Sequence, residues 1–106
     1  MKPRIIHLDV ICYKEDELWV AHCLQLDLVT TANTSEQAFC DMEDVVRTHI
    51  EYIIKNDNWE YLFKPAPPGV LNLFLKSHPV EDESTGHFDF SNLLPQTNIE
   101  IQRLYA

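Results

Sequence analysis

The adjacent pair His22-Cys23 is the nearest approach in this sequence to a catalytic arrangement. A cysteine nucleophile needs a base within hydrogen-bond reach of its thiol. The pair falls in an apolar run over residues 18–24 that is typical of a β-strand, and successive side chains on a strand point to opposite faces. Because this separates the imidazole from the thiol, we predict that Cys23 is a buried apolar thiol and that the chain has no catalytic residue.

Three histidines could hold a metal ion if the fold brought them together. His7, His22 and His49 would have to converge where the sheet meets the helix, since a metal site needs several ligands around one point. Partly buried, hydrogen-bonded histidines are the simpler interpretation, so we predict no metal and no other cofactor. The sequence also lacks a phosphate-binding loop, a dinucleotide fingerprint and a paired-carboxylate signature. We therefore expect a protein that is not an enzyme.

Two features could bind a partner protein. Asp41, Asp44 and Glu51 lie on one face of a predicted helix, where they form either a surface for a basic partner or an ordinary solvated face. Trp19 and Trp59 are suited to anchoring an interface, but packing in the core explains them equally well. The candidate partner-binding residues are Asp41, Asp44, Glu51 and Trp19.

Apolar alternation predicts three strands that precede this helix, over residues 5–13, 18–24 and 28–32. The first strand has one wholly apolar face, formed by Ile6, Leu8, Val10 and Cys12, which we expect to face the core. The connections between the strands are too short for a parallel crossover. The three strands therefore form an antiparallel meander.

A helix is predicted over residues 35–56. The sequence Thr34-Ser35-Glu36-Gln37 fits a capping box, in which the Thr34 hydroxyl accepts from the backbone of Gln37 and the Gln37 side chain reaches back. Apolar residues then recur at steps of three and four. Such a helix is roughly 33 Å long, enough to cross a sheet of three or four strands.

The remaining residues extend this core. Residues 70–76 fit a short helix or a strand, and we favour the helix because Pro68 suits a first turn. Residues 78–95, with the acidic run 81–83, are predicted to form a loop, and residues 98–105 a fourth strand added at an edge of the sheet.

We expect a single α+β domain over residues 1–106, with a core over 4–56 and an extension over 57–106. Its antiparallel sheet of three to four strands carries one long helix on one face, in the order β-β-β-α-β. Pairing with a second copy or a partner would cover the exposed edge of such a sheet.

The chain is acidic, with 17 acidic and 8 basic residues and a formal net charge of −9. This balance argues against nucleic-acid binding, which needs clustered lysine and arginine. It suits a basic partner, or is simply an acidic surface. Three cysteines without paired spacing, and a beginning that lacks a signal-peptide pattern, predict a cytoplasmic protein with reduced thiols, and no apolar run approaches a membrane span.

Residues 19–29 and 33–38 resemble the HicB-like antitoxin family, whose members have a partial RNase H-like core. The family pattern is an aromatic-Val-Ala run, a short loop, a Val/Thr strand and then Gly-Asp-Thr-x-x-Glu-Ala at the start of the helix. The resemblance covers residues 5–54. Departures from the pattern are Leu24, Asp27, Ala32 and Gln37, where the family often has Pro, Gly, Gly and Glu.

The resemblance implies a non-catalytic protein-binding module. Its partner would be a small basic RNA-cleaving toxin of the HicA type, neutralised by occlusion. Many such antitoxins add a DNA-binding domain, but the residues after Phe63 have too few basic side chains for one, so we expect no direct nucleic-acid binding. That absence favours the alternative, a stand-alone HicB-like homodimer or higher homo-oligomer with a role such as ligand sensing or scaffolding.

Overall fold

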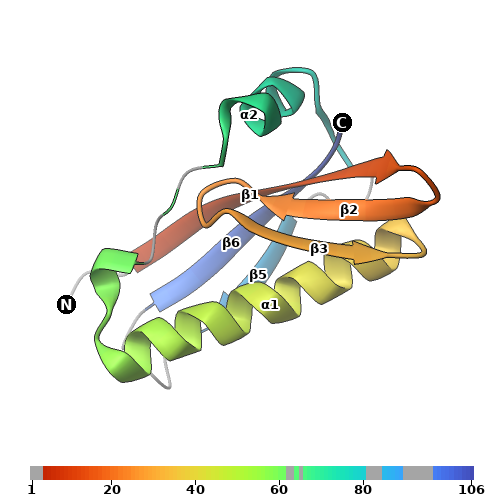
Figure 1. Cartoon of the computed structure of the whole chain (residues 1–106). Helices are drawn as coiled ribbons and strands as arrows, with labels where there is room; N and C mark the ends of the chain where they lie inside the picture. Colours follow the sequence, from red (N-terminus) through yellow and green to blue (C-terminus); the bar gives the residue numbers. More distant parts are fainter. Residues whose placement is uncertain (1–3, 62–63, 65, 81–84, 90–96) are drawn as a thin grey trace.

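The computed structural model describes residues 4–61, 64, 66–80, 85–89 and 97–106 of the chain. One mixed sheet carries the long helix α1 on one face and the short helix α2 on the other (Figure 1). The elements in chain order are β1 (Arg4–Glu15), β2 (Leu18–Cys23), β3 (Leu28–Ala32), α1 (Ser35–Asn56), the 3-10 turn η1 (Trp59–Tyr61), α2 (Pro68–Leu75), β4 (His78–Pro79), β5 (Thr85–Asp89) and β6 (Thr97–Tyr105). The predicted α+β class, with one long helix packed on one face, is confirmed. The prediction of an antiparallel sheet with three to four strands is wrong, since the described residues form a mixed sheet of six strands.

The strand order is β3-β2-β1-β6-β4, and β5 also pairs with β6. The predicted meander of β1, β2 and β3 is confirmed, since both of its pairings are antiparallel. The prediction that the last strand lies at an edge is wrong, because β6 pairs with β1 in the interior of the sheet, and this pairing is parallel. Parallel pairing needs a long crossover, and the chain between β1 and β6, which includes α1, provides it.

The prediction that residues 78–95 form a loop is wrong in part. Residues 78–79 form β4 and residues 85–89 form β5, and both strands pair antiparallel with β6. The edge of β6 that faces away from β1 offers backbone groups that need partners, which explains why these short segments are extended. Pro79 and Gly86 interrupt the strand pattern in the sequence. The predicted loop residues 81–84 and 90–95 lie outside the described residues.

The main core lies between α1 and the sheet. Ile6 and Leu8 of β1 lie directly opposite Ile99 and Ile101 of β6, and these four side chains are buried. From α1, the buried residues Ala38, Phe39, Met42, Val46, Ile50 and Ile53 pack on this surface. The apolar faces predicted for β1 and for the helix therefore meet, as amphipathic elements must to remove their apolar surface from water.

Helix α1 begins and ends where its sequence predicts. The Thr34 hydroxyl accepts from the Gln37 backbone N–H at 3.1 Å. The Gln37 side chain does not reach back, as the predicted capping box required, but donates to Asp41 at 2.7 Å. The helix ends at Asp57, which has the left-handed conformation with φ 51° and whose N–H binds the carbonyl groups of the last turn.

Helix α2 covers part of the opposite face of the sheet. The segment that leads into it is held to the end of β2, because the Lys64 and Ala66 N–H groups donate to the Gln25 and Leu24 carbonyl groups, each at 2.9 Å. A second cluster joins the helix to the sheet, with Ile11, Leu24, Ala66 and Leu104 buried against Val70, Leu73 and Phe74. The predicted short helix is thus confirmed, and it packs on the sheet through one side only.

The interior position of β6 predicts unequal effects of two identical substitutions. Ile101→Ala should lower the free energy of unfolding by about 2–5 kcal/mol, because it leaves a cavity between β6 and α1. Ile5→Ala, on the neighbouring strand, should lower it by less than about 1 kcal/mol, since that side chain is 53% exposed whereas Ile101 is fully buried. Urea unfolding followed by circular dichroism measures both, and equal losses would contradict the placement of β6.

Candidate functional site

The three carboxylates predicted to bind a partner lie on the outward face of α1, which is defined by Asp41, Asp44 and Glu51. Asp44 is exposed, and Asp41 and Glu51 are partly exposed. Because the buried face of the helix packs on the sheet, these groups project from a fixed support. The nearby Glu43 behaves differently, since Arg103 of β6 donates its Nε–H to the Glu43 carboxylate at 2.8 Å. Glu43 therefore ties α1 to the sheet. Asp41, Asp44 and Glu51 share the outward face with the exposed basic residues Arg47 and Lys55.

Trp19 does not join these carboxylates. It is partly buried against the main core, on the side of the sheet that α1 covers. Its ring centroid lies 6.2 Å from that of Tyr105 and 6.0 Å from the Lys14 ammonium group. The Tyr105 hydroxyl is in turn 3.2 Å from the Ser35 hydroxyl at the start of α1. Trp19 thus belongs to an aromatic contact between β2, β6 and α1, and Trp59 also packs against the core.

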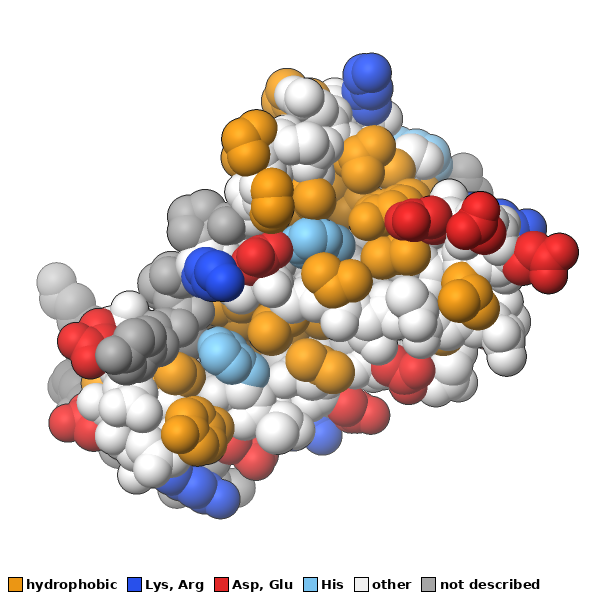
Figure 2. Space-filling view, in the orientation of Figure 1, with side chains coloured by type: hydrophobic (Ala, Val, Ile, Leu, Met, Phe, Trp, Pro, Cys, Tyr) orange, Lys and Arg blue, Asp and Glu red, His pale blue; other side chains and the backbone are white. Residues whose placement is uncertain are grey.

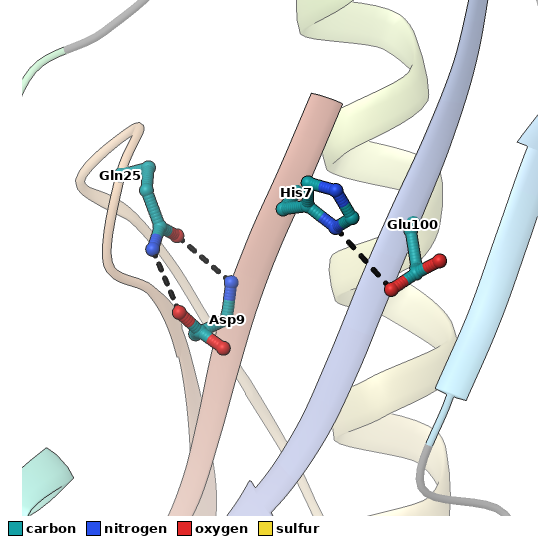
Figure 3. Close-up of polar contacts among 4 residues, drawn as sticks. All are labelled: His7, Asp9, Gln25 and Glu100. Atoms are coloured by element: carbon teal, nitrogen blue, oxygen red, sulfur yellow. Dashed lines mark hydrogen bonds and ion pairs between the residues drawn. The ribbon is translucent and has the colours of Figure 1, made fainter. Parts of the chain in front are cut away.

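A polar group that the sequence analysis missed lies on the other face of the sheet (Figure 3). The Gln25 carbonyl oxygen accepts from the Asp9 backbone N–H at 2.8 Å, and the Gln25 amide donates to the Asp9 carboxylate at 2.8 Å. The Leu24 N–H donates to the Asp9 carbonyl at 2.9 Å. These bonds continue the β1–β2 ladder beyond the end of β2 and satisfy backbone groups of β1. Beside them, His7 Nδ1 lies 3.2 Å from Glu100, in a pair exposed enough to add little stability (Figure 3).

His22 and Cys23 lie on opposite faces of the sheet, as their adjacent positions predict. His22 Nε2 lies 2.8 Å from the Asp27 carboxylate, and their side chains are 6% and 21% exposed. Asp27 has the left-handed conformation with φ 51°, which brings its side chain back across the β2–β3 turn. An aspartate that orients a histidine is common in hydrolytic sites. Here Cys23 lies on the opposite face, toward α1, and so cannot act with His22. The His22–Asp27 pair instead stabilises the β2–β3 turn.

The buried cysteines are poor nucleophiles. Burial raises the pKa of the Cys12 thiol and of the Cys23 thiol to about 11 in each case. Nucleophilic attack needs the thiolate, which such thiols do not form near neutral pH. Both side chains are fully buried on the face that α1 covers, whereas Cys40 is exposed.

The three candidate metal-binding histidines do not meet. His7 and His22 lie on the face of the sheet opposite α1, and His49 lies on α1 itself. Along the part of the chain that the structure describes, no group of three or more histidine, cysteine, aspartate or glutamate side chains is arranged to hold a metal ion.

No protein-family model matches the chain, and neither a curated protein nor a solved structure shows significant similarity to it. Among the described helices, none combines the length and apolar character needed to span a membrane.

The difference in thiol burial predicts selective labelling. In the native protein one thiol, that of Cys40, should react readily with Ellman's reagent near pH 8, and all three should react after unfolding in urea. A Cys40→Ser variant should show almost no reaction until it is unfolded. Rapid reaction of two or three thiols in the native wild-type protein would contradict the burial of Cys12 and Cys23.

The raised thiol pKa values also predict a loss of stability in alkali. The unfolded chain loses its thiol protons near pKa 9.0, whereas the folded protein retains those of Cys12 and Cys23 up to about 11. Stability from these groups is therefore complete below pH 9 and declines as pH rises toward 11, by about 1 kcal/mol per thiol at pH 10. Urea unfolding at pH 8 and pH 10 measures the decline, and the double variant Cys12→Ala/Cys23→Ala should show a smaller one. An equal decline in the two proteins would contradict the assignment.

Proposed function

We propose that this chain is a non-catalytic, HicB-like protein-binding module that holds a small basic protein, an RNA-cleaving toxin of the HicA type, against the outward face of α1. The observation that carries the proposal is the position of Asp41, Asp44 and Glu51 on the side of the helix that faces away from the sheet. Their carboxylates can receive lysine and arginine side chains of a partner. Occlusion of the toxin's RNA-binding surface would follow from contact alone, without chemistry by this chain.

The support of α1 favours binding by this face. The helix is held by its buried side, by the Thr34 cap and by the Arg103–Glu43 pair. Because the helix backbone that carries these carboxylates is already fixed, a partner loses little free energy in ordering it on binding. The formal net charge of −9 adds a long-range attraction for a basic protein, which raises its rate of association at low salt.

The order of the core elements also supports the proposal. Strands β1, β2 and β3, then α1, then β6 make up the β-β-β-α-β order that the resemblance to the HicB-like family implies. The free thiols of Cys12, Cys23 and Cys40 agree with a reducing compartment, so we place the protein in the cytoplasm.

Neutralising the outward face should weaken the complex. The probe is a purified, catalytically inactive HicA-type toxin from the same genome, titrated with the triple variant Asp41→Asn/Asp44→Asn/Glu51→Gln in isothermal calorimetry. We expect the Kd to rise by about tenfold or more at low ionic strength, and the difference from wild type to shrink near 1 M salt, because salt screens exposed charges.

The matched control carries the same charge change on the β1–β2 turn, as Glu15→Gln/Asp16→Asn/Glu17→Gln. Asparagine is used at position 16 because Asp16 has φ 56°, a conformation that asparagine tolerates. This control should keep the wild-type Kd within about twofold, since rim charges outside an interface act weakly. Equal weakening in the two variants would show attraction by net charge rather than by α1. Full RNA cleavage by the active toxin in the presence of excess wild-type protein would overturn the proposal.

A second candidate function is that of a stand-alone homo-oligomeric HicB-like protein with a scaffolding role. One observation favours it, the uncharged edge of the sheet at β3.

A further inference from the structure

Within the described residues, strand β3 forms one border of the sheet and pairs on one side only, with β2. Its sequence, Leu-Val-Thr-Thr-Ala, contains no charged residue and no proline, and its residues pair one to one with those of β2 without a bulge. Soluble proteins usually protect such an edge with lysine, proline or a bulge. The opposite border shows such protection at β4, which is two residues long and contains Pro79. The outer edge of β3 can therefore pair with a strand of another chain.

The side of α1 that adjoins β3 is also unusual, and we define this β3-side flank by Val45, His49 and Tyr52. Helix α1 packs mainly against β2 and β3, and Glu43, which binds Arg103 of β6, lies on its other side. Tyr52 is 59% exposed, although tyrosine carries a large apolar ring. The His49 Nε2 atom is buried and has no hydrogen-bond partner among the described residues.

The surface over β3 differs from its surroundings in charge. Figure 2 shows acidic side chains gathered over the end of the β1–β2 hairpin and both acidic and basic side chains along α1, whereas the side chains over β3 are hydrophobic or uncharged. Two copies of a chain with a net charge of −9 repel each other, and contact through uncharged surface avoids adding close pairs of like charges. The edge of β3 meets this condition, and it offers no charge with which a basic partner could be recognised.

We propose that a second copy of this chain pairs its β3 antiparallel with β3, about a twofold axis near Thr30, so that one sheet runs through a homodimer. This register places Leu28 opposite Ala32, Val29 opposite Thr31, and Thr30 opposite its own copy. Each large side chain meets a small one, and no charges are opposed, as an isologous strand pair requires. The half-exposed Val29 is covered.

The same axis brings the two β3-side flanks together. Both copies of α1 lie on the same face of the continuous sheet, with the flanks facing each other. Tyr52, which is 59% exposed in the single chain, then packs against the second copy. These helix contacts enlarge an interface that a five-residue strand alone would leave small. This dimer does not depend on the proposed binding of a basic protein by α1.

The test is sedimentation of the full chain, with no other protein present. The wild-type protein should sediment as a dimer of the 12.4 kDa chain. The double variant Val29→Lys/Thr31→Lys places like charges opposite each other and should raise the dimer dissociation constant by about tenfold or more. The matched control Ile5→Lys/Leu18→Lys, at exposed positions of β1 and β2, should remain dimeric. Circular dichroism establishes that each variant is folded.

A mixing experiment tests the register. The variant Val29→Glu/Thr31→Glu should also be monomeric, and an equimolar mixture with Val29→Lys/Thr31→Lys should form a heterodimer, because opposite charges then face each other. Tyr52→Ala should independently weaken the wild-type dimer. A wild-type protein that stays monomeric at about 0.1 mM would overturn the proposal and leave β3 for a strand of another protein. A dimer that survives both charged variants would overturn it as well.

Discussion

The parallel pairing of β1 with β6 is the constraint on which the rest of the structure depends. It places Ile6 beside Ile99 and Leu8 beside Ile101, and these rows form the floor on which α1 packs. On the opposite face the same pair brings Ile11 beside Leu104, where α2 packs. The placement of α2 depends on this pair, and that of α1 depends on it together with β2 and β3, against which α1 mainly packs.

Local structure was largely predictable because its causes are local. Alternation of apolar residues located β1, β2 and β3, and the Thr34 cap with the apolar stripe located α1. The position of β6 was not predictable in this way, since its alternation shows that it is a strand but does not show which strand it joins. Strand order depends on contacts between residues far apart in the sequence. The short β4 and β5 were missed because they exist only through pairing with β6.

The candidate site was likewise predictable where it depends on local patterns and was missed where it depends on contacts between distant residues. Helical periodicity correctly placed Asp41, Asp44 and Glu51 on one face, and strand alternation separated His22 from Cys23. The Asp27 partner of His22 was missed, although an aspartate just beyond the strand, in a short turn, is a signal that could have suggested it. The bond between Gln25 and Asp9 joins residues sixteen positions apart and has no counterpart in the sequence pattern.

The pairing of Arg4 with Thr97 joins residues near the two ends of the chain, so it also affects how the protein folds during its synthesis on the ribosome. The meander and α1 are synthesised first, but the edge of β1 that pairs with β6 lacks its neighbour until about 90 further residues have been added. During that interval β1 presents an open backbone edge to other nascent chains. We therefore expect the sheet to be completed only after β6 has been made, and a chain that ends before β6 to expose the β6-facing edge of β1 to aggregation or proteolysis.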